Sequence, residues 1–134
     1  MIRVVLDTNV VVSALLNPQG APGQIFLMIL QEPDLELCMS AGVFAEYEEV
    51  IRRPRLQRSQ SEIDDALKTV REQGLWVKPT DKVHGCEDAD DDIFLECAEA
   101  ADAQYIVTGN TKHFPSSWGS TRIVTPREFL DLTV

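Results

Sequence analysis

Five short segments with the composition or alternation of β-strands are separated along the chain by segments with helical features. The expected strands cover residues 2–6, 35–39, 75–77, 104–108 and 122–124. Strands that alternate with helices form a parallel sheet, because each crossover brings the chain back to the edge from which it started. Helices then cover both faces of that sheet. The sequence therefore predicts an α/β fold with a mainly parallel sheet.

The segments between the expected strands carry helix signals. The clearest segment begins after Ser40, a suitable N-cap, has an apolar stripe and ends before Pro54. The stripe consists of Val43, Phe44, Tyr47, Val50 and Ile51. The other expected helices cover residues 10–16, 22–30, 60–73 and 93–101, and a last one begins at Pro126.

Size and composition exclude several classes of protein. The chain has 134 residues, which is the length of one domain, so we expect a single domain over residues 1–134. No apolar run approaches the roughly 20 residues that cross a bilayer, which excludes a membrane-spanning helix. The first residues are charged too early for a signal peptide. Three cysteines without a C-x-x-C pair argue against a disulfide framework or a zinc ribbon, and we expect a reducing, cytoplasmic location.

Acidic residues dominate the charge and are unevenly distributed. The chain has 22 acidic and 12 basic residues, for a net charge of -10. This balance argues against a broad basic surface that coats nucleic acid. Five of the acidic residues fall within positions 87–92, whereas four of the basic residues fall within positions 52–58. Such segregation suggests that the two segments have different roles.

Several polar side chains are predicted to meet at one edge of the sheet. Asp7 follows the first strand, Asn110 follows a later one, and ligands of such sheets bind beyond the carboxyl ends of the strands. Glu46 lies about 100° from the centre of the apolar stripe on its helix, at the edge of the buried face. The acidic cluster opens another helix. Carboxylates without a basic partner favour a hard divalent cation, and paired cations about 4 Å apart are the usual arrangement for phosphodiester cleavage.

Each of these features also has an ordinary structural interpretation. Asp7 alone could cap the following helix, and the acidic cluster could be a solvated helix N-terminus. The spacing of Asp88, Asp90 and Asp92 matches a calcium-binding EF-hand loop, but Ile93 occupies the position where that loop needs glycine. His113 follows Asn110 closely, and we expect it to be a surface imidazole. The hypothesis of a site depends on the joint placement of the acidic residues.

Four segments, taken in order, resemble the motifs of PIN domains. They are V-V-L-D-T-N-V at 4–10, S-A-G-V-F-A-E-Y at 40–47, E-D-A-D-D-D-I-F-L-E-C-A at 87–98 and Y-I-V-T-G-N-T-K-H-F at 105–114. The most similar subgroup is the short, VapC-like bacterial PIN proteins identified as toxins of toxin–antitoxin pairs. The resemblance implies a three-layer α/β/α, Rossmann-like fold. It also implies cleavage of single-stranded RNA with Mg²⁺ or Mn²⁺, a cognate antitoxin and a homodimer.

The resemblance assigns the site residue by residue. Asp7, Glu46 and one aspartate of the third motif would be metal ligands and catalytic residues. Alignment on residues 107–108 favours Asp92, whereas alignment on residue 98 favours Asp91, so both are retained. Asn110 stands where many relatives have aspartate. Its carbonyl oxygen can still face a metal or a bound water, but it adds no charge, which weakens a second metal site.

The basic run suggests a path for RNA, and two other functions remain open. Arg52, Arg53 and Arg55 lie just beyond the Glu46 helix, and we expect them to guide an RNA backbone toward the acidic residues. Because Asn110 is uncharged, a non-catalytic PIN-like module that binds RNA or protein is the first alternative. A structure-specific DNA nuclease that uses the same site is the second.

Overall fold

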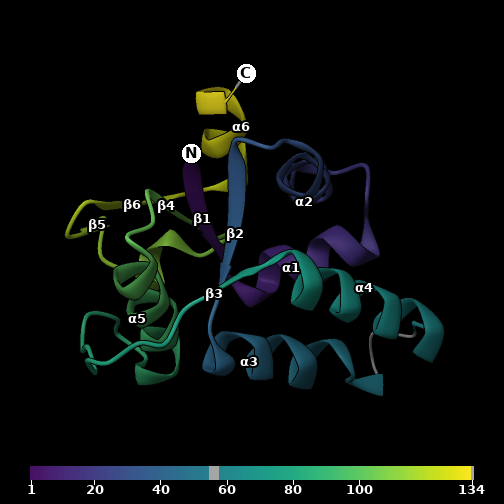
Figure 1. Cartoon of the computed structure of the whole chain (residues 1–134), viewed down its shortest axis with the longest axis horizontal. Coiled ribbons are helices and arrows are strands. Elements are labelled where there is room, and N and C mark those ends of the chain that lie inside the picture. Colours follow the sequence, from purple (N-terminus) through teal and green to yellow (C-terminus); the bar gives the residue numbers. More distant parts are fainter. Residues whose placement is uncertain (55–57, 134) are drawn as a thin grey trace.

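The computed structural model describes residues 1–54 and 58–133, which include a six-stranded sheet in the order β3-β2-β1-β4-β6-β5 (Figure 1). The first four pairings along that order are parallel, and only β5 runs antiparallel to its neighbour. The strands are β1 (Ile2–Leu6), β2 (Leu35–Met39), β3 (Leu75–Trp76), β4 (Tyr105–Val107), β5 (Ser117–Trp118) and β6 (Thr121–Val124). The predicted three-layer α/β fold with a mainly parallel sheet is confirmed.

Helices follow the strands as the sequence predicts, with small shifts at their ends. They are α1 (Thr8–Leu16), α2 (Ala21–Gln31), α3 (Ala41–Ile51), α4 (Gln60–Gln73), α5 (Asp92–Ala101) and α6 (Pro126–Thr133), with short 3-10 turns η2 (Ala89–Asp91) and η3 (Thr111–His113). Ser40 caps α3 by accepting a hydrogen bond from the Val43 amide at 3.2 Å. None of the helices in the described ranges is long and apolar enough to cross a bilayer.

Two local features differ from the sequence prediction. Strand β5 was not predicted, because a two-residue strand is too short to show an alternating pattern; it pairs with β6 through a turn at Gly119, whose φ is +58°. Most of the acidic cluster precedes α5. Its residues form the turn η2, which Asp88 caps by accepting a hydrogen bond from the Asp90 amide at 3.0 Å. Asp91 ends this turn, and Asp92 is the first residue of α5.

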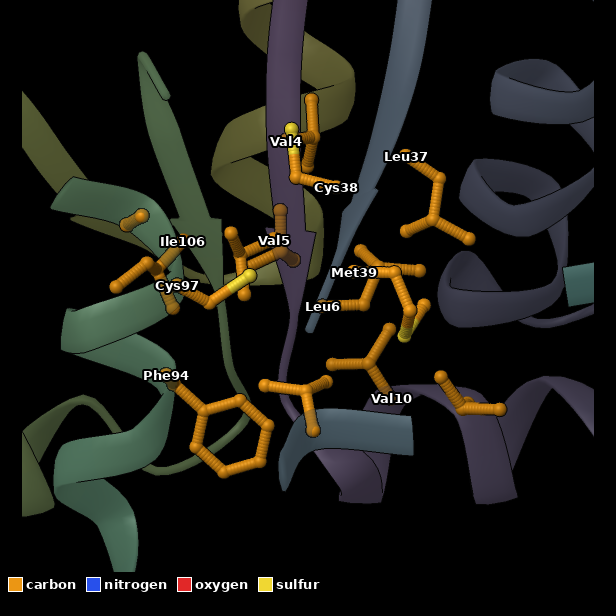
Figure 2. Close-up of a cluster of buried hydrophobic side chains, with 14 of the residues drawn as sticks. Val4, Val5, Leu6, Val10, Leu37, Cys38, Met39, Phe94, Cys97 and Ile106 are labelled. Atoms are coloured by element: carbon orange, nitrogen blue, oxygen red, sulfur yellow. The ribbon is translucent and has the colours of Figure 1, made fainter. Parts of the chain in front are cut away.

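The core forms where α5 packs against the centre of the sheet. Figure 2 shows Cys97 of α5 beside Val5 of β1 and Ile106 of β4, and all three side chains are fully buried. On the opposite face, the ring of Phe129 from α6 meets Tyr105 edge-on at 5.6 Å. Burial on both faces explains why the central strands are continuous apolar runs that end abruptly at polar residues.

Tyr47 links α3 to the end of β1 through a hydrogen bond. Its ring is completely buried, and its hydroxyl donates a hydrogen bond to the carbonyl oxygen of Leu6, the residue before Asp7. Burial raises the pKa of the Tyr47 hydroxyl well above its ordinary value, so it remains a donor at neutral pH. Because Glu46 precedes Tyr47 on α3, this contact also sets the distance between Glu46 and Asp7.

Replacing Tyr47 with phenylalanine should therefore destabilise the fold. The Leu6 carbonyl would lose its hydroxyl partner in a buried place, which costs about 1–3 kcal/mol of unfolding free energy. Urea unfolding of both proteins measures this difference. Tyr105→Phe is the matched control, because no hydrogen bond of the Tyr105 hydroxyl occurs in residues 1–54 and 58–133; equal losses in the two variants would contradict the role of the Tyr47 hydroxyl.

Candidate functional site

Asp7 lies at the carboxyl end of β1 and is joined to the end of β4. Its side chain is only 6% exposed, and its Oδ2 accepts a hydrogen bond from the Thr108 hydroxyl at 2.7 Å. The same Thr108 oxygen accepts a hydrogen bond from the Asn110 amide at 3.0 Å. Burial raises the pKa of Asp7, while the hydrogen bonds from Thr108 and the Thr8 amide, and then the charge of His113, lower it. The structure thus places Asp7 and Asn110 at one edge of the sheet.

Asp91 shares this edge with Asp7. It ends the turn η2, and its pKa is raised to about 6 by burial first and then by the negative charges of Asp7 and Asp88. The Nδ1 atom of His113 lies 3.9 Å from its Oδ2 and partly offsets this effect. Because Asp7 contributes to the shift, the two carboxylates are close enough to repel each other.

Glu46 reaches the same edge from α3. Its side chain is half-buried, as its position beside the apolar stripe predicts. Burial is the main reason that its pKa is raised; Glu49 raises it further, Arg53 lowers it, and the more distant Asp7 and Asp90 add to the rise. The negative charge of Glu46 also raises the pKa of Asp91. The carboxylates of Asp7, Glu46 and Asp91 therefore form one electrostatically coupled group, which we call the acidic rim.

Asp92 has different surroundings from its neighbour Asp91. It is 5% exposed, and its Oδ1 accepts hydrogen bonds from the amides of Gly85 at 3.1 Å and Cys86 at 2.9 Å. One turn further along α5, Glu96 accepts a hydrogen bond from the Val83 amide at 3.3 Å. These contacts hold the segment 77–88 against α5. The sequence leaves Asp91 and Asp92 as candidates for the third metal ligand. Asp91 belongs to the acidic rim, whereas Asp92 holds a loop against α5.

The described arginines at the start of the basic run, Arg52 and Arg53, are paired with carboxylates. Arg52 pairs with Asp64 at 3.0 Å, and Arg53 pairs with Glu49 at 2.8 Å. Arg55, the third residue of the predicted RNA path, lies outside the described residues. The charges of Arg52 and Arg53 are thus partly neutralised by carboxylates on α3 and α4.

One residue of the site was missed from the sequence. Thr108 fixes Asp7, yet in the sequence it is only the last residue of an apolar strand. A hydroxyl at the carboxyl end of a buried strand, next to glycine, is the signal that could have identified it. His113, expected as a surface imidazole, is exposed, and it also lies beside Asp91.

The carboxylates of the acidic rim repel one another, and their oxygen atoms are suitable ligands for a hard divalent cation. Within residues 1–54 and 58–133, no three His, Cys, Asp or Glu side chains lie close enough together to form a complete metal-binding group. Burial nevertheless raises the pKa of Asp7, and burial together with the negative charge of Asp7 raises the pKa of Asp91. A cation would relieve that repulsion, and Mg²⁺ ordinarily completes its shell with water. The donors therefore suit an ion bound by few protein ligands.

Comparisons with known proteins support the fold and show which family matches the chain. The family model described as PIN domain matches residues 3–112. An uncharacterized protein of Methanocaldococcus jannaschii is 28% identical over 142 residues, which cover 97% of this chain and 90% of that protein. A chain in the crystal structure of VapBC2 from Rickettsia felis, bound to a DNA fragment from its promoter, superposes with a TM-score of 0.59. It is 14% identical and covers 92% of this chain and 98% of its own.

The raised pKa of Asp91 predicts a pH dependence of stability. The folded protein holds this proton up to about pH 6, whereas the unfolded chain releases it near its ordinary value of 3.8. The free energy of unfolding should therefore fall as the pH rises from about 4 to about 6. Asp91→Asn removes the ionisation and should raise the unfolding free energy at pH 7 relative to the parent protein, with little difference below pH 4. Urea unfolding at several pH values in EDTA measures this.

A substitution of the same kind on another helix provides the control. Asp65→Asn removes an exposed charge from α4 and should leave the dependence between pH 4 and 6 unchanged. If Asp91→Asn has the same slope as the parent protein over this interval, Asp91 is not the group that titrates there.

Proposed function

The chain belongs to the PIN-domain family, and we propose that it is a metal-dependent endoribonuclease that cleaves single-stranded RNA as the toxin of a toxin–antitoxin pair. PIN domains are generally nucleases. The observation that supports the proposal most strongly is the acidic rim, because the negative charges of Asp7 and Glu46 both raise the pKa of Asp91 at the ligand-binding edge of a parallel sheet. The metal requirement, the RNA substrate and the role as a toxin are parts of the proposal.

The chemistry assigns distinct tasks to the residues of the rim. Asp7, Asp91 and Glu46 would hold Mg²⁺ or Mn²⁺, and Asn110 would offer its carbonyl oxygen to the ion or to a bound water. A divalent ion bound there supplies Lewis acidity and makes water a stronger nucleophile. Thr108 orients the Asp7 carboxylate by donating a hydrogen bond to its Oδ2. No protein residue becomes covalently bonded to the substrate.

The partners follow from the same proposal. A VapBC2 complex is among the similar solved structures, which supports a cognate antitoxin as the partner of this chain. A homodimer is the expected form of the toxin. Arg52, Arg53 and Arg55 are proposed to contact the RNA backbone, for which Arg52 and Arg53 would exchange their ion pairs with Asp64 and Glu49 for phosphates.

Cleavage of a single-stranded RNA by the purified protein tests the nuclease. With Mn²⁺ the protein should cut, with EDTA it should not, and Asp7→Asn should lower the rate about 100-fold or more because a buried metal ligand loses its charge. Asp65→Asn should cut at the parent rate.

The remaining outcomes separate the alternatives. Equal cutting by the parent and Asp7→Asn would mean that the cleavage does not come from this site. If neither protein cuts RNA, the uncharged Asn110 favours a PIN-like module that binds without cleavage. Competition by structured DNA that is stronger than competition by RNA would favour the DNA nuclease.

Asp91 and Asp92 form an adjacent pair that tests the ligand assignment. Asp91→Asn should abolish cleavage without loss of stability. Asp92→Asn should weaken the anchoring of Gly85 and Cys86 and cost about 1.5–3 kcal/mol of unfolding free energy, because its hydrogen bonds are made by a charged acceptor. Cleavage rates and urea unfolding are measured on both variants. The reverse pattern would assign the third metal ligand to Asp92.

A further inference from the structure

Trp76 is a large aromatic side chain held in place at the surface. It ends the edge strand β3 and is 43% exposed. Its Nε1 donates a hydrogen bond to the Arg71 carbonyl at 2.9 Å, and its ring packs on Phe44 with the centroids 5.5 Å apart and the planes tilted by 42°. The indole is therefore oriented by contacts on one side and open to solvent on the other.

A groove begins at Val77, the residue after Trp76, and extends toward the elements next to the acidic rim. It has a volume of about 320 Å³, and its lining includes Gly42 of α3 and Ile93 and Glu96 of α5. Gly42 lies one turn before Glu46 on α3, and Ile93 follows Asp91, the last residue of η2, by two positions. The groove thus lies between the strand end that carries Trp76 and the helices α3 and α5. β3 and β1 run in the same direction, so their carboxyl ends lie at the same edge of the sheet.

Positive charges flank Trp76 without carboxylate partners. In contrast to Arg52 and Arg53, neither Arg71 nor Lys78 forms an ion pair within the described residues. The Arg71 guanidinium lies 5.1 Å from the centroid of the Phe44 ring, and Lys78 lines the groove. Arg71 and Lys78 thus place two cations close to an exposed indole, an arrangement that suits the phosphates of a stacked single strand.

We propose that Trp76 stacks on a base of the single-stranded RNA whose backbone enters the acidic rim, with Arg71 and Lys78 contacting its phosphates. This inference rests on the proposed function, because it concerns the substrate of the same site. An exposed aromatic face with neighbouring cations is the usual platform for a single strand, and it tolerates any base because every base has a π-face. A duplex hides those faces in its own stack, so the platform selects unpaired RNA.

Tryptophan fluorescence tests the stacking without cleavage. Trp118→Phe leaves Trp76 as the only tryptophan, and Asp7→Asn in the same protein prevents hydrolysis. Adding a short oligouridylate in EDTA should quench the remaining fluorescence to saturation, because a base stacked on the indole quenches it. A duplex RNA of the same length should quench much less. Circular dichroism and urea unfolding of the double variant show that it is folded.

Substitutions at Trp76 show whether the aromatic face is required. In the cleavage-deficient Asp7→Asn background, Trp76→Leu keeps an apolar cover over Phe44 but should weaken oligouridylate binding by about 5- to 150-fold, the value of one stacked base. Trp76→Phe should restore most of the affinity. Arg71→Gln with Lys78→Gln should reduce the dependence of binding on salt, whereas Arg122→Gln with Arg127→Gln, on β6 and α6, should not.

The outcomes distinguish this inference from the nuclease itself. If the parent protein cuts RNA and Trp76→Leu has an unchanged KM and affinity, the stacking is wrong and the nuclease stands. If oligouridylate quenches Trp76 but the parent protein does not cut, the stacking is supported and the nuclease is wrong. Absence of quenching in the folded double variant overturns the stacking.

Discussion

The site depends on the burial of one carboxylate, Asp7, at the end of the central strand. Taking a carboxylate out of water is costly, and the Thr108 hydroxyl and the Thr8 amide compensate only part of that cost, so the pKa of Asp7 remains raised. The fold nonetheless holds Asp91 and Glu46 near enough to be affected by the same charge. Such an arrangement opposes folding in the absence of a cation, which is a common property of functional sites. Stability and cation affinity are thus linked through Asp7.

The local geometry at the start of α5 explains how one acidic cluster serves two purposes. Asp91 ends a 3-10 turn, whereas Asp92 is the first residue of the α-helix, so their side chains leave the backbone in different directions. Asp91 meets Asp7, and Asp92 meets the amides of Gly85 and Cys86. Gly85 suits this place because a Cβ there would lie 2.5 Å from the Trp118 ring and 2.7 Å from Leu95. The loop that Asp92 holds therefore packs against α5 and β5, and it supports the turn that presents Asp91.

The sequence predicts the architecture far better than it predicts the details of the site. The five apolar strands and the N-cap at Ser40 follow from local pattern, since burial on both faces and helix initiation leave clear signals. β5 was missed because its pairing depends on the turn at Gly119 rather than on its two residues. The choice between Asp91 and Asp92 stayed open because both are aspartates in one acidic run. Adjacent side chains leave any helix in different directions, and the sequence does not show which of the two directions faces Asp7. Thr108 was missed for a related reason: its partner, Asp7, lies 101 positions away.

The net charge of -10 also affects how RNA would approach a site of this kind. Phosphates and the acidic rim repel each other, so a substrate backbone can approach Asp7 closely only when positive charge is present between them. Arg52 and Arg53 are already paired with carboxylates, whereas the His113 imidazole lies 3.9 Å from the Asp91 carboxylate. Contacts that do not depend on phosphate charge, such as stacking on Trp76, can hold a strand outside the rim. In that arrangement the aromatic contact provides affinity, and cation binding at the rim determines whether the backbone enters it.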